Sequence, residues 1–134
     1  MSELIDLRSE GLLARVNTHG AELVSLRLLD ETELLWQGDP AIWAKQSPIL
    51  FPIVGSLKDG KMQHEGQTYE MGIHGFAAAR DFSIANSSDT HCRLLLTSDE
   101  GTRAQYPFPF ELAQDYRLRP TALEMEGTVR NTGE

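Results

Sequence analysis

The sequence predicts an all-β protein, an antiparallel β-sandwich, on three observations. Apolar and polar residues alternate with a period of two in one segment after another. These segments recur about every ten residues and are separated by turn-forming Gly, Pro, Asn and Asp. Helical periodicity is nearly absent, so we expect less than about one-tenth helix.

Length and composition fit one compact domain over residues 1–134. Hydrophobic residues make up 40% of the chain and charged residues 24%, as in ordinary soluble proteins. A net charge of −8 without a basic run argues against nucleic acid and membrane partners. The N-terminus lacks the pattern of a secretory signal, and we expect a cytoplasmic protein. Cys92 stands alone in an alternating segment and is interpreted as a core thiol.

Three strands are predicted in the first third of the chain. Residues 12–16 and 21–28 alternate and are joined by a turn at 18–20. A third, short strand is expected at 33–36. Residues 39–44 are interpreted as one helical turn, because Asp39 suits the N-cap and Pro40 the first helical position.

The remaining chain predicts a turn at 58–61 and then further strands. A hairpin is expected around Glu65-Gly66. After this hairpin, the loop 86–89 separates the predicted strands 81–85 and 92–97. The predicted strands are 62–64, 68–71, 81–85, 92–97, 110–118 and 122–129. The last residues form a turn signal at 131–134 with no strand after it.

The segment Ser47–Gly55 and the segment Gly72–Phe76 are the candidate functional region. Two prolines, Pro48 and Pro52, exclude a helix interior and a central strand, which leaves an extended, bent segment packed on the core. His74 has glycine on both sides within two residues, at Gly72 and Gly75, so backbone or ligand can approach it closely. From spacing alone, a structural histidine satisfied by backbone and a site residue both remain open for His74.

Several segments together resemble the aldose 1-epimerase, or galactose mutarotase-like, family. They follow one another in the order that the family uses and cover nearly the whole chain. The segments are 20–26, 34–39, 48–55, 74–77, 106–110, 116–118 and 129–133. Members of the family are roughly twice as long, so the chain resembles their N-terminal half.

The resemblance implies an isomerase that opens and recloses the ring of a hexose at its anomeric carbon by acid–base catalysis, without metal or cofactor. It implies that His74 is catalytic and that Phe51, Gly75, Phe76 and Arg80 contact the sugar. A second histidine and a catalytic carboxylate would lie in the other half. The 134 residues alone are therefore expected to be incomplete and inactive.

Two positions depart from the family pattern. Relatives often have arginine where this chain has Ser56 and Ala78, and arginine suits bidentate contacts to sugar hydroxyls. The alternative is therefore a non-catalytic carbohydrate-binding or assembly module that keeps the scaffold.

Other chemistry-bearing residues have structural interpretations. His19, His64 and His91 lie in or beside turns and are expected on the solvated surface, and no metal-ligand spacing occurs. Trp36 and Trp43 are interpreted as core anchors rather than sugar platforms. Tyr106 and Phe108 are expected to cap the sandwich.

Self-association through exposed strand edges is also expected. Alternating apolar residues in the last two strands would be left uncovered without a second half, and few Pro or Lys residues protect those edges. The residues concerned are Phe110, Leu112, Tyr116, Leu118, Leu123, Met125 and Val129.

Overall fold

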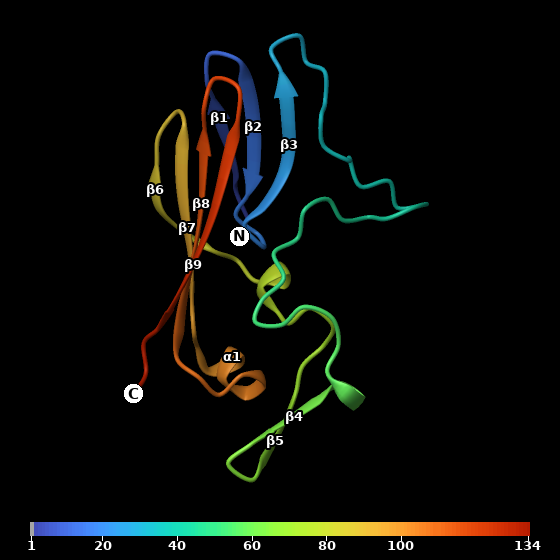
Figure 1. The fold of residues 1–134 in the computed structure, drawn as a ribbon, viewed down its shortest axis with the longest axis vertical. Helices are drawn as coiled ribbons and strands as arrows, with labels where there is room; N and C mark the ends of the chain where they lie inside the picture. Colours follow the sequence, from blue (N-terminus) through green and yellow to red (C-terminus); the bar gives the residue numbers. More distant parts are fainter. Residues whose placement is uncertain (1) are drawn as a thin grey trace.

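The computed structural model describes residues 2–134 and consists of two antiparallel sheets packed face to face, with a small hairpin beyond them (Figure 1). The first sheet contains β1 (Leu4–Arg8), β2 (Leu12–Asn17) and β3 (Glu22–Leu28) in that order. A bulge between Arg15 and Val16 shifts the register of β2 against β3.

The second sheet has the order β6–β7–β8–β9. Its strands are β6 (Ser83–Ser87), β7 (His91–Thr97), β8 (Phe110–Leu118) and β9 (Leu123–Asn131). Each strand pairs with the next along the chain in antiparallel fashion, and the connection between β7 and β8 contains the short helix described below.

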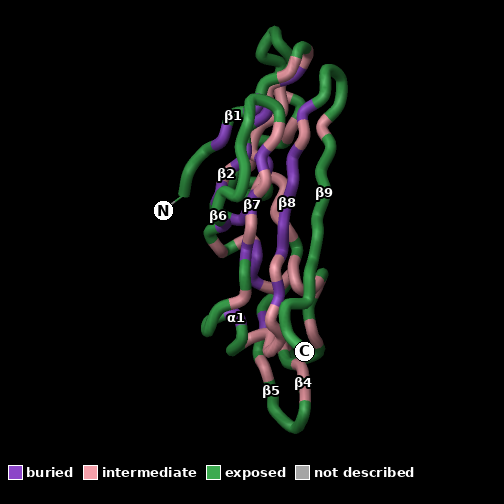
Figure 2. The backbone as a smooth tube through the Cα atoms, turned by 90° about the vertical axis from the view of Figure 1, so that its left-hand side faces the viewer, coloured by how far each residue is buried: buried purple, intermediate pink, exposed green. Residues whose placement is uncertain are grey.

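The core lies between the two sheets. Leu7, Val16, Leu94 and Tyr116 are almost completely buried there. The hydroxyl of Tyr116 donates to the carbonyl oxygen of Ala21 at 2.5 Å, so β8 is tied to the start of β3. β8 is buried along nearly its whole length, whereas β9 is exposed (Figure 2).

Short elements connect the sheets. A 3₁₀ turn at Lys58–Gly60 leads into the hairpin of β4 (Lys61–His64) and β5 (Gln67–Glu70), and a second 3₁₀ turn lies at Ala77–Ala79. Helix α1 (Glu100–Gln105) begins at Asp99, whose side chain accepts the backbone N–H of Thr102 in a capping box. No helix in the described part of the chain is long and apolar enough to cross a membrane.

The all-β fold is confirmed, but several local predictions are wrong. Residues 33–36 form no strand, only an isolated bridge between Arg27 and Glu33, because the carboxylate of Glu33 takes the hydrogen bonds there. The single turn predicted at residues 39–44 is present: Asp39 O accepts the N–H groups of Ile42 and Trp43, and the Asp39 side chain caps the turn by accepting the N–H of Ala41.

Two elements have no counterpart in the predicted pattern, and a third lies at a shifted position. β1 and α1 were not predicted, because β1 is short and the polar residues of α1 have no apolar stripe. The strand expected at 81–85 lies at β6 instead and takes in part of the loop predicted at 86–89.

Two predictions of burial are overturned. Trp36 and Trp43 are 40% and 49% exposed, on a loop that projects from the molecule (Figure 1), with the indole N–H of Trp36 donating to Trp43 O at 2.9 Å. Four of the seven residues expected to be uncovered lie in the core, because both sheets already enclose the inner face of β8. These are Phe110, Leu112, Tyr116 and Leu118.

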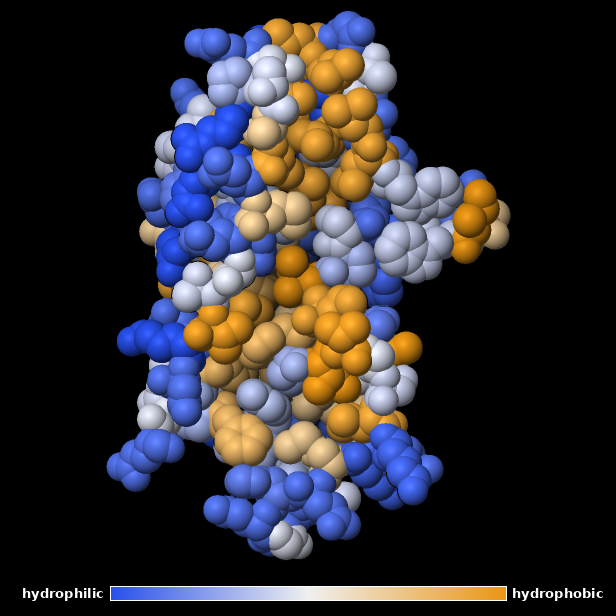
Figure 3. Space-filling view, in the orientation of Figure 1, coloured by the Kyte–Doolittle hydropathy of each residue, from blue (hydrophilic) through white to orange (hydrophobic). Residues whose placement is uncertain are grey.

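Apolar side chains are nevertheless exposed. Met125 and Val129 of β9 are 50% and 58% exposed, and Val54 and Ile73 are more exposed still. Apolar surface extends over much of the face drawn in Figure 3.

Candidate functional site

The candidate site is built where residues 48–55 lie beside residues 72–77. Phe51 and Gly75 form a parallel bridge, and the carbonyl oxygen of Phe51 accepts the N–H groups of Phe76 at 2.9 Å and Ala77 at 3.1 Å. The Phe51–Pro52 peptide bond is cis. The proline-interrupted segment therefore forms one isolated bridge and no strand of a sheet, as its two prolines predicted.

Gly75 allows this close approach. Its φ is +74°, and a Cβ atom there would lie 2.6 Å from Cδ of Pro52 and still closer to the Phe51 carbonyl group. Only glycine fits both the backbone conformation and the space. Its role in the structure is steric, and contact with a sugar stays a prediction.

His74 is fixed by two hydrogen bonds to Gly55. The backbone N–H of His74 donates to Gly55 O at 2.8 Å, and the Gly55 N–H donates to Nδ1 of the His74 ring at 2.8 Å. His74 has φ of +63°, which is unusual for a residue other than glycine. Because Nδ1 accepts a hydrogen bond, the proton of the neutral ring is on Nε2.

His74 lines a small cavity of about 180 Å³. Ligand pockets are commonly about 300–1,000 Å³, so this cavity is smaller than a typical complete site. Its lining includes Ala78, where the family resemblance led us to expect arginine, and no carboxylate. The remaining lining residues are Lys45, Pro48, Leu50, Ile73, Gly75 and Ala79.

Lys45 is a site residue that sequence reasoning missed. It lies on an irregular loop, and only tertiary contacts bring it to the cavity. The backbone after it is attached to β3, because the carboxylate of Glu22 accepts the N–H groups of Gln46 and Ser47, both at 3.0 Å. The Ser47 hydroxyl also donates to Leu23 O at 2.7 Å. No local pattern in the sequence signals this placement.

Phe51 and Phe76 lie behind the site rather than in it. Their ring centroids are 6.2 Å apart in an edge-to-face arrangement, and both pack against Tyr106 and Phe110. Phe76 is only 5% exposed, and neither phenyl group lines the cavity. The backbone of Phe51 bridges Gly75 beside His74, but both phenyl groups pack in the core, and their contact with a sugar stays a prediction.

Arg80 is directed to another part of the molecule. Its guanidinium group lies 3.2 Å from the carboxylate of Asp99 and over the ring of Phe76, so it braces the start of α1. The N–H of Thr102, together with this guanidinium, holds the pKa of Asp99 below its usual value. Arg80 does not line the His74 cavity, and the structure gives its predicted sugar contact no support.

The other histidines are partly as expected. His19 is half-exposed and its Nδ1 lies 2.7 Å from the carboxylate of Asp81, while His64 stacks edge-on against Phe108. The prediction for His91 is wrong: its ring is mostly buried, with Nε2 at 2.7 Å from the completely buried Asp115. Arg93 and Arg117 contact the same carboxylate, so this is a structural ion cluster.

Among residues 2–134, no group of three or more His, Cys, Asp or Glu side chains could hold a metal ion. Cys92 is buried and free, as predicted, and burial with the nearby charge of Asp115 raises the pKa of its thiol to about 11. It is therefore a core thiol rather than a nucleophile.

The sandwich and the constrained histidine define a class: galactose mutarotase-like β-sandwich proteins. A family model described as Aldose 1-epimerase matches residues 3–134. The chain belongs to the aldose 1-epimerase family.

Individual proteins that resemble the chain in sequence and structure support this family assignment. A galactose mutarotase related enzyme from Lactobacillus acidophilus is 36% identical, with a TM-score of 0.94 over 96% of this chain and 43% of its own. A galactose mutarotase-like protein from Lactobacillus casei is 32% identical, with a TM-score of 0.92 over 96% of this chain and 44% of its own. The plasmid-borne protein LacX of Lactococcus lactis subsp. lactis is 31% identical over 95% of this chain and 44% of its own length.

The chain thus spans less than half the length of these relatives. Its conformation is the one that the corresponding part of the longer relatives adopts, as the TM-scores of 0.94 and 0.92 indicate.

Proposed function

We propose that this chain supplies the first histidine of an aldose 1-epimerase-type site for a hexose. The observation that carries the proposal is the His74 ring. It lines a cavity, and its Nδ1 is occupied by the Gly55 N–H, so Nε2–H is the group left to donate to a ligand.

The chemistry needs one donor and one base. A base removes the proton of the C1 hydroxyl, the bond between C1 and the ring oxygen breaks, and the ring oxygen takes a proton. Rotation about C1–C2 and reclosure by the reverse steps give the other anomer. Nε2–H of His74 is suited to hydrogen-bond the ring oxygen as negative charge develops on it. The base and a second histidine would come from the part of the fold that relatives have beyond this chain.

A non-catalytic sugar-binding module is the second candidate. Ala78 lines the cavity where relatives often carry arginine, and Ser56 replaces the other arginine. Loss of both guanidinium groups removes bidentate contacts to sugar hydroxyls without removing the His74 donor. Binding without turnover, in a protein completed by its second half, would distinguish this candidate from the enzyme.

Galactose binding tests the proposal directly. In heteronuclear NMR of the isotopically labelled chain, galactose should shift the imidazole signals of His74 saturably, with millimolar affinity. His74→Asn should abolish the shift in neighbouring Ile73 and Gly75. His19→Asn, which changes an exposed histidine paired to Asp81, serves as the matched control. Shifts that are absent, or that persist in His74→Asn, would refute the sugar site.

The chain is also proposed to pair with a second copy of itself through β9. This strand is the edge of its sheet, is exposed from Glu124 to Asn131 and contains no Pro or Lys. An antiparallel pair centred on Gly127 would place Glu124 opposite Arg130 of the second copy. The same register would place Met125 opposite Val129, so both charge and apolar surface would be complementary.

A further inference from the structure

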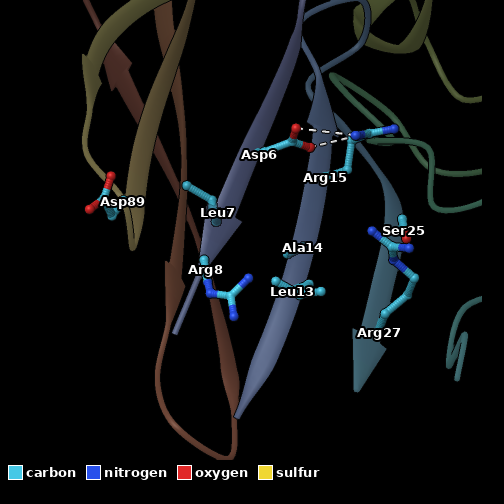
Figure 4. A pocket seen from close by; sticks show the side chains of 9 residues that line it. All are labelled: Asp6, Leu7, Arg8, Leu13, Ala14, Arg15, Ser25, Arg27 and Asp89. Atoms are coloured by element: carbon cyan, nitrogen blue, oxygen red, sulfur yellow. Dashed lines mark hydrogen bonds and ion pairs between the residues drawn. The ribbon is translucent and has the colours of Figure 1, made fainter. Parts of the chain in front are cut away.

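The outer face of the first sheet carries a hollow of about 460 Å³ that is separate from the His74 cavity (Figure 4). Its lining brings three arginines together, one from each strand: Arg8 from β1, Arg15 from β2 and Arg27 from β3. Asp6 and Asp89 also line the hollow, so the three guanidinium groups leave it with a small positive excess in a chain whose net charge is −8.

The strand register places the arginines in two neighbouring rows. In one row Arg8 pairs with Leu13, and Leu13 pairs with Arg27. Two strand spacings of 4.7–4.9 Å put the Arg8 and Arg27 backbones about 10 Å apart. Their long side chains can therefore reach one ligand from opposite sides, over the apolar side chain of Leu13. Like charges this close cost stability when nothing neutralises them.

The second row contains Arg15, which lies between two polar residues. It pairs with Asp6 on one side and Ser25 on the other. The Arg15 guanidinium binds the Asp6 carboxylate through two hydrogen bonds, at 2.6 and 3.1 Å, which also lowers the pKa of Asp6. The charge of Arg15 is therefore already neutralised, and it forms a wall of the hollow.

The charges of Arg8 and Arg27 are less neutralised by carboxylates than the charge of Arg15. Arg8 makes no side-chain ion pair or hydrogen bond within residues 2–134. Arg27 lies 3.5 Å from Glu31, whose side chain is 77% exposed, so that contact is loose. The charge of Arg27 also acts on the nearby carboxylates of Asp6 and Glu33 without an ion pair. Asp89 also lines the hollow, but Figure 4 draws its carboxylate beyond Leu7, apart from the Arg8 guanidinium.

We propose that this hollow binds a small phosphate monoester, with Arg8 and Arg27 holding the phosphate from two sides and Leu13 beneath the organic part. A phosphate dianion matches two guanidinium forks in charge and in geometry. The apolar floor favours an organic phosphate over the inorganic ion. This site is distinct from the proposed sugar site and does not depend on it, since the two cavities share no lining residue.

Arginine side-chain NMR tests the site. Inorganic phosphate and phenyl phosphate are titrated at constant ionic strength, set with sodium chloride, into the labelled chain, and the Nε–H signals are followed. Saturable shifts are expected for Arg8 and Arg27, with phenyl phosphate binding more tightly. Arg8→Gln should weaken binding by at least about threefold, in the range of one charge-assisted contact on a screened surface. Arg8→Lys should recover only part of the loss, because lysine lacks the fork.

The matched control is Arg119→Gln. Arg119 is an exposed arginine that binds Glu124 through two hydrogen bonds, so its replacement changes the net charge equally. It should leave phosphate binding unchanged. Chemical shifts that rise linearly with phosphate on all arginines would indicate nonspecific attraction and overturn the site. An equal loss of phosphate affinity in Arg8→Gln and Arg119→Gln would overturn it for the same reason. Unchanged affinity in Arg8→Gln would overturn it as well.

Discussion

The ring of His74 and the backbone of Gly55 hold each other in place. Gly55 N–H donates to Nδ1 of His74, and His74 N–H donates to Gly55 O, both at 2.8 Å. One side chain thus joins the two segments that form the site and fixes its own tautomer. The φ of +63° at His74 is the backbone cost of that arrangement.

Replacing His74 should separate strain from hydrogen bonding. His74→Ala loses the acceptor for Gly55 N–H and keeps an unfavourable φ, so we expect unfolding free energy to fall by about 1–3 kcal/mol. His74→Asn should cost less, because asparagine tolerates this conformation and can accept a hydrogen bond. Urea unfolding measures both. Equal losses in the two variants would contradict this account.

The bridge between Phe51 and Gly75 predicts a large effect of one methyl group. In Gly75→Ala the new Cβ would meet the Phe51 carbonyl and Pro52 in a left-handed backbone conformation, so more than about 3 kcal/mol should be lost. Gly55→Ala is the matched control: its φ is +83°, but nothing lies within 4 Å of the added atom. It should cost about 1 kcal/mol. Similar losses in the two variants would show that sterics at Phe51 are not decisive.

The chain by itself should not accelerate interconversion of sugar anomers. It presents one imidazole at the cavity and no carboxylate there, and loss of one acid–base partner costs about 10²–10⁴-fold. Polarimetry of freshly dissolved galactose, with and without the chain, measures this. A catalysed rate that disappears in His74→Ala would show that the half fold is sufficient.

Pairing of β9 predicts a concentration-dependent dimer. Sedimentation at micromolar concentration should give a mass near twice 15.0 kDa. Val129→Lys should return it to the monomer, because a lysine there breaks the apolar contact with Met125 and charges the edge. Ile84→Lys, on the exposed edge strand β6 at the opposite side of the sheet, is the control and should stay dimeric. A wild-type monomer would refute the pairing.

Cys92 should be unreactive in the folded protein. Its thiol has a pKa of about 11, raised by burial and by Asp115, so at pH 8 it remains protonated and inaccessible. Alkylation by iodoacetamide should be at least about a hundredfold slower than in the urea-unfolded chain, where the thiol returns to an ordinary pKa of about 8.5. Mass spectrometry over time measures both rates. A native rate within tenfold of the unfolded one would contradict the buried placement.

The sequence by itself determined most of the strand pattern and marked the two segments of the candidate site. The predicted alternation with a period of two appears as alternate burial in β2 and β7, because each has one face against the core. The spacing of Pro48, Pro52 and Gly75 likewise predicted an irregular segment with one histidine, since these residues restrict the backbone locally. Local chemistry of this kind is readable without knowing what packs where.

Tertiary structure alone decided which side chains meet. Phe76 turns into the core and Arg80 reaches Asp99, although both follow His74 closely in sequence. Lys45 reaches the cavity from an irregular loop. Arg8 and Arg27 become neighbours only through the register of three strands. Such contacts depend on packing between segments distant in sequence, and no local preference of the chain encodes them.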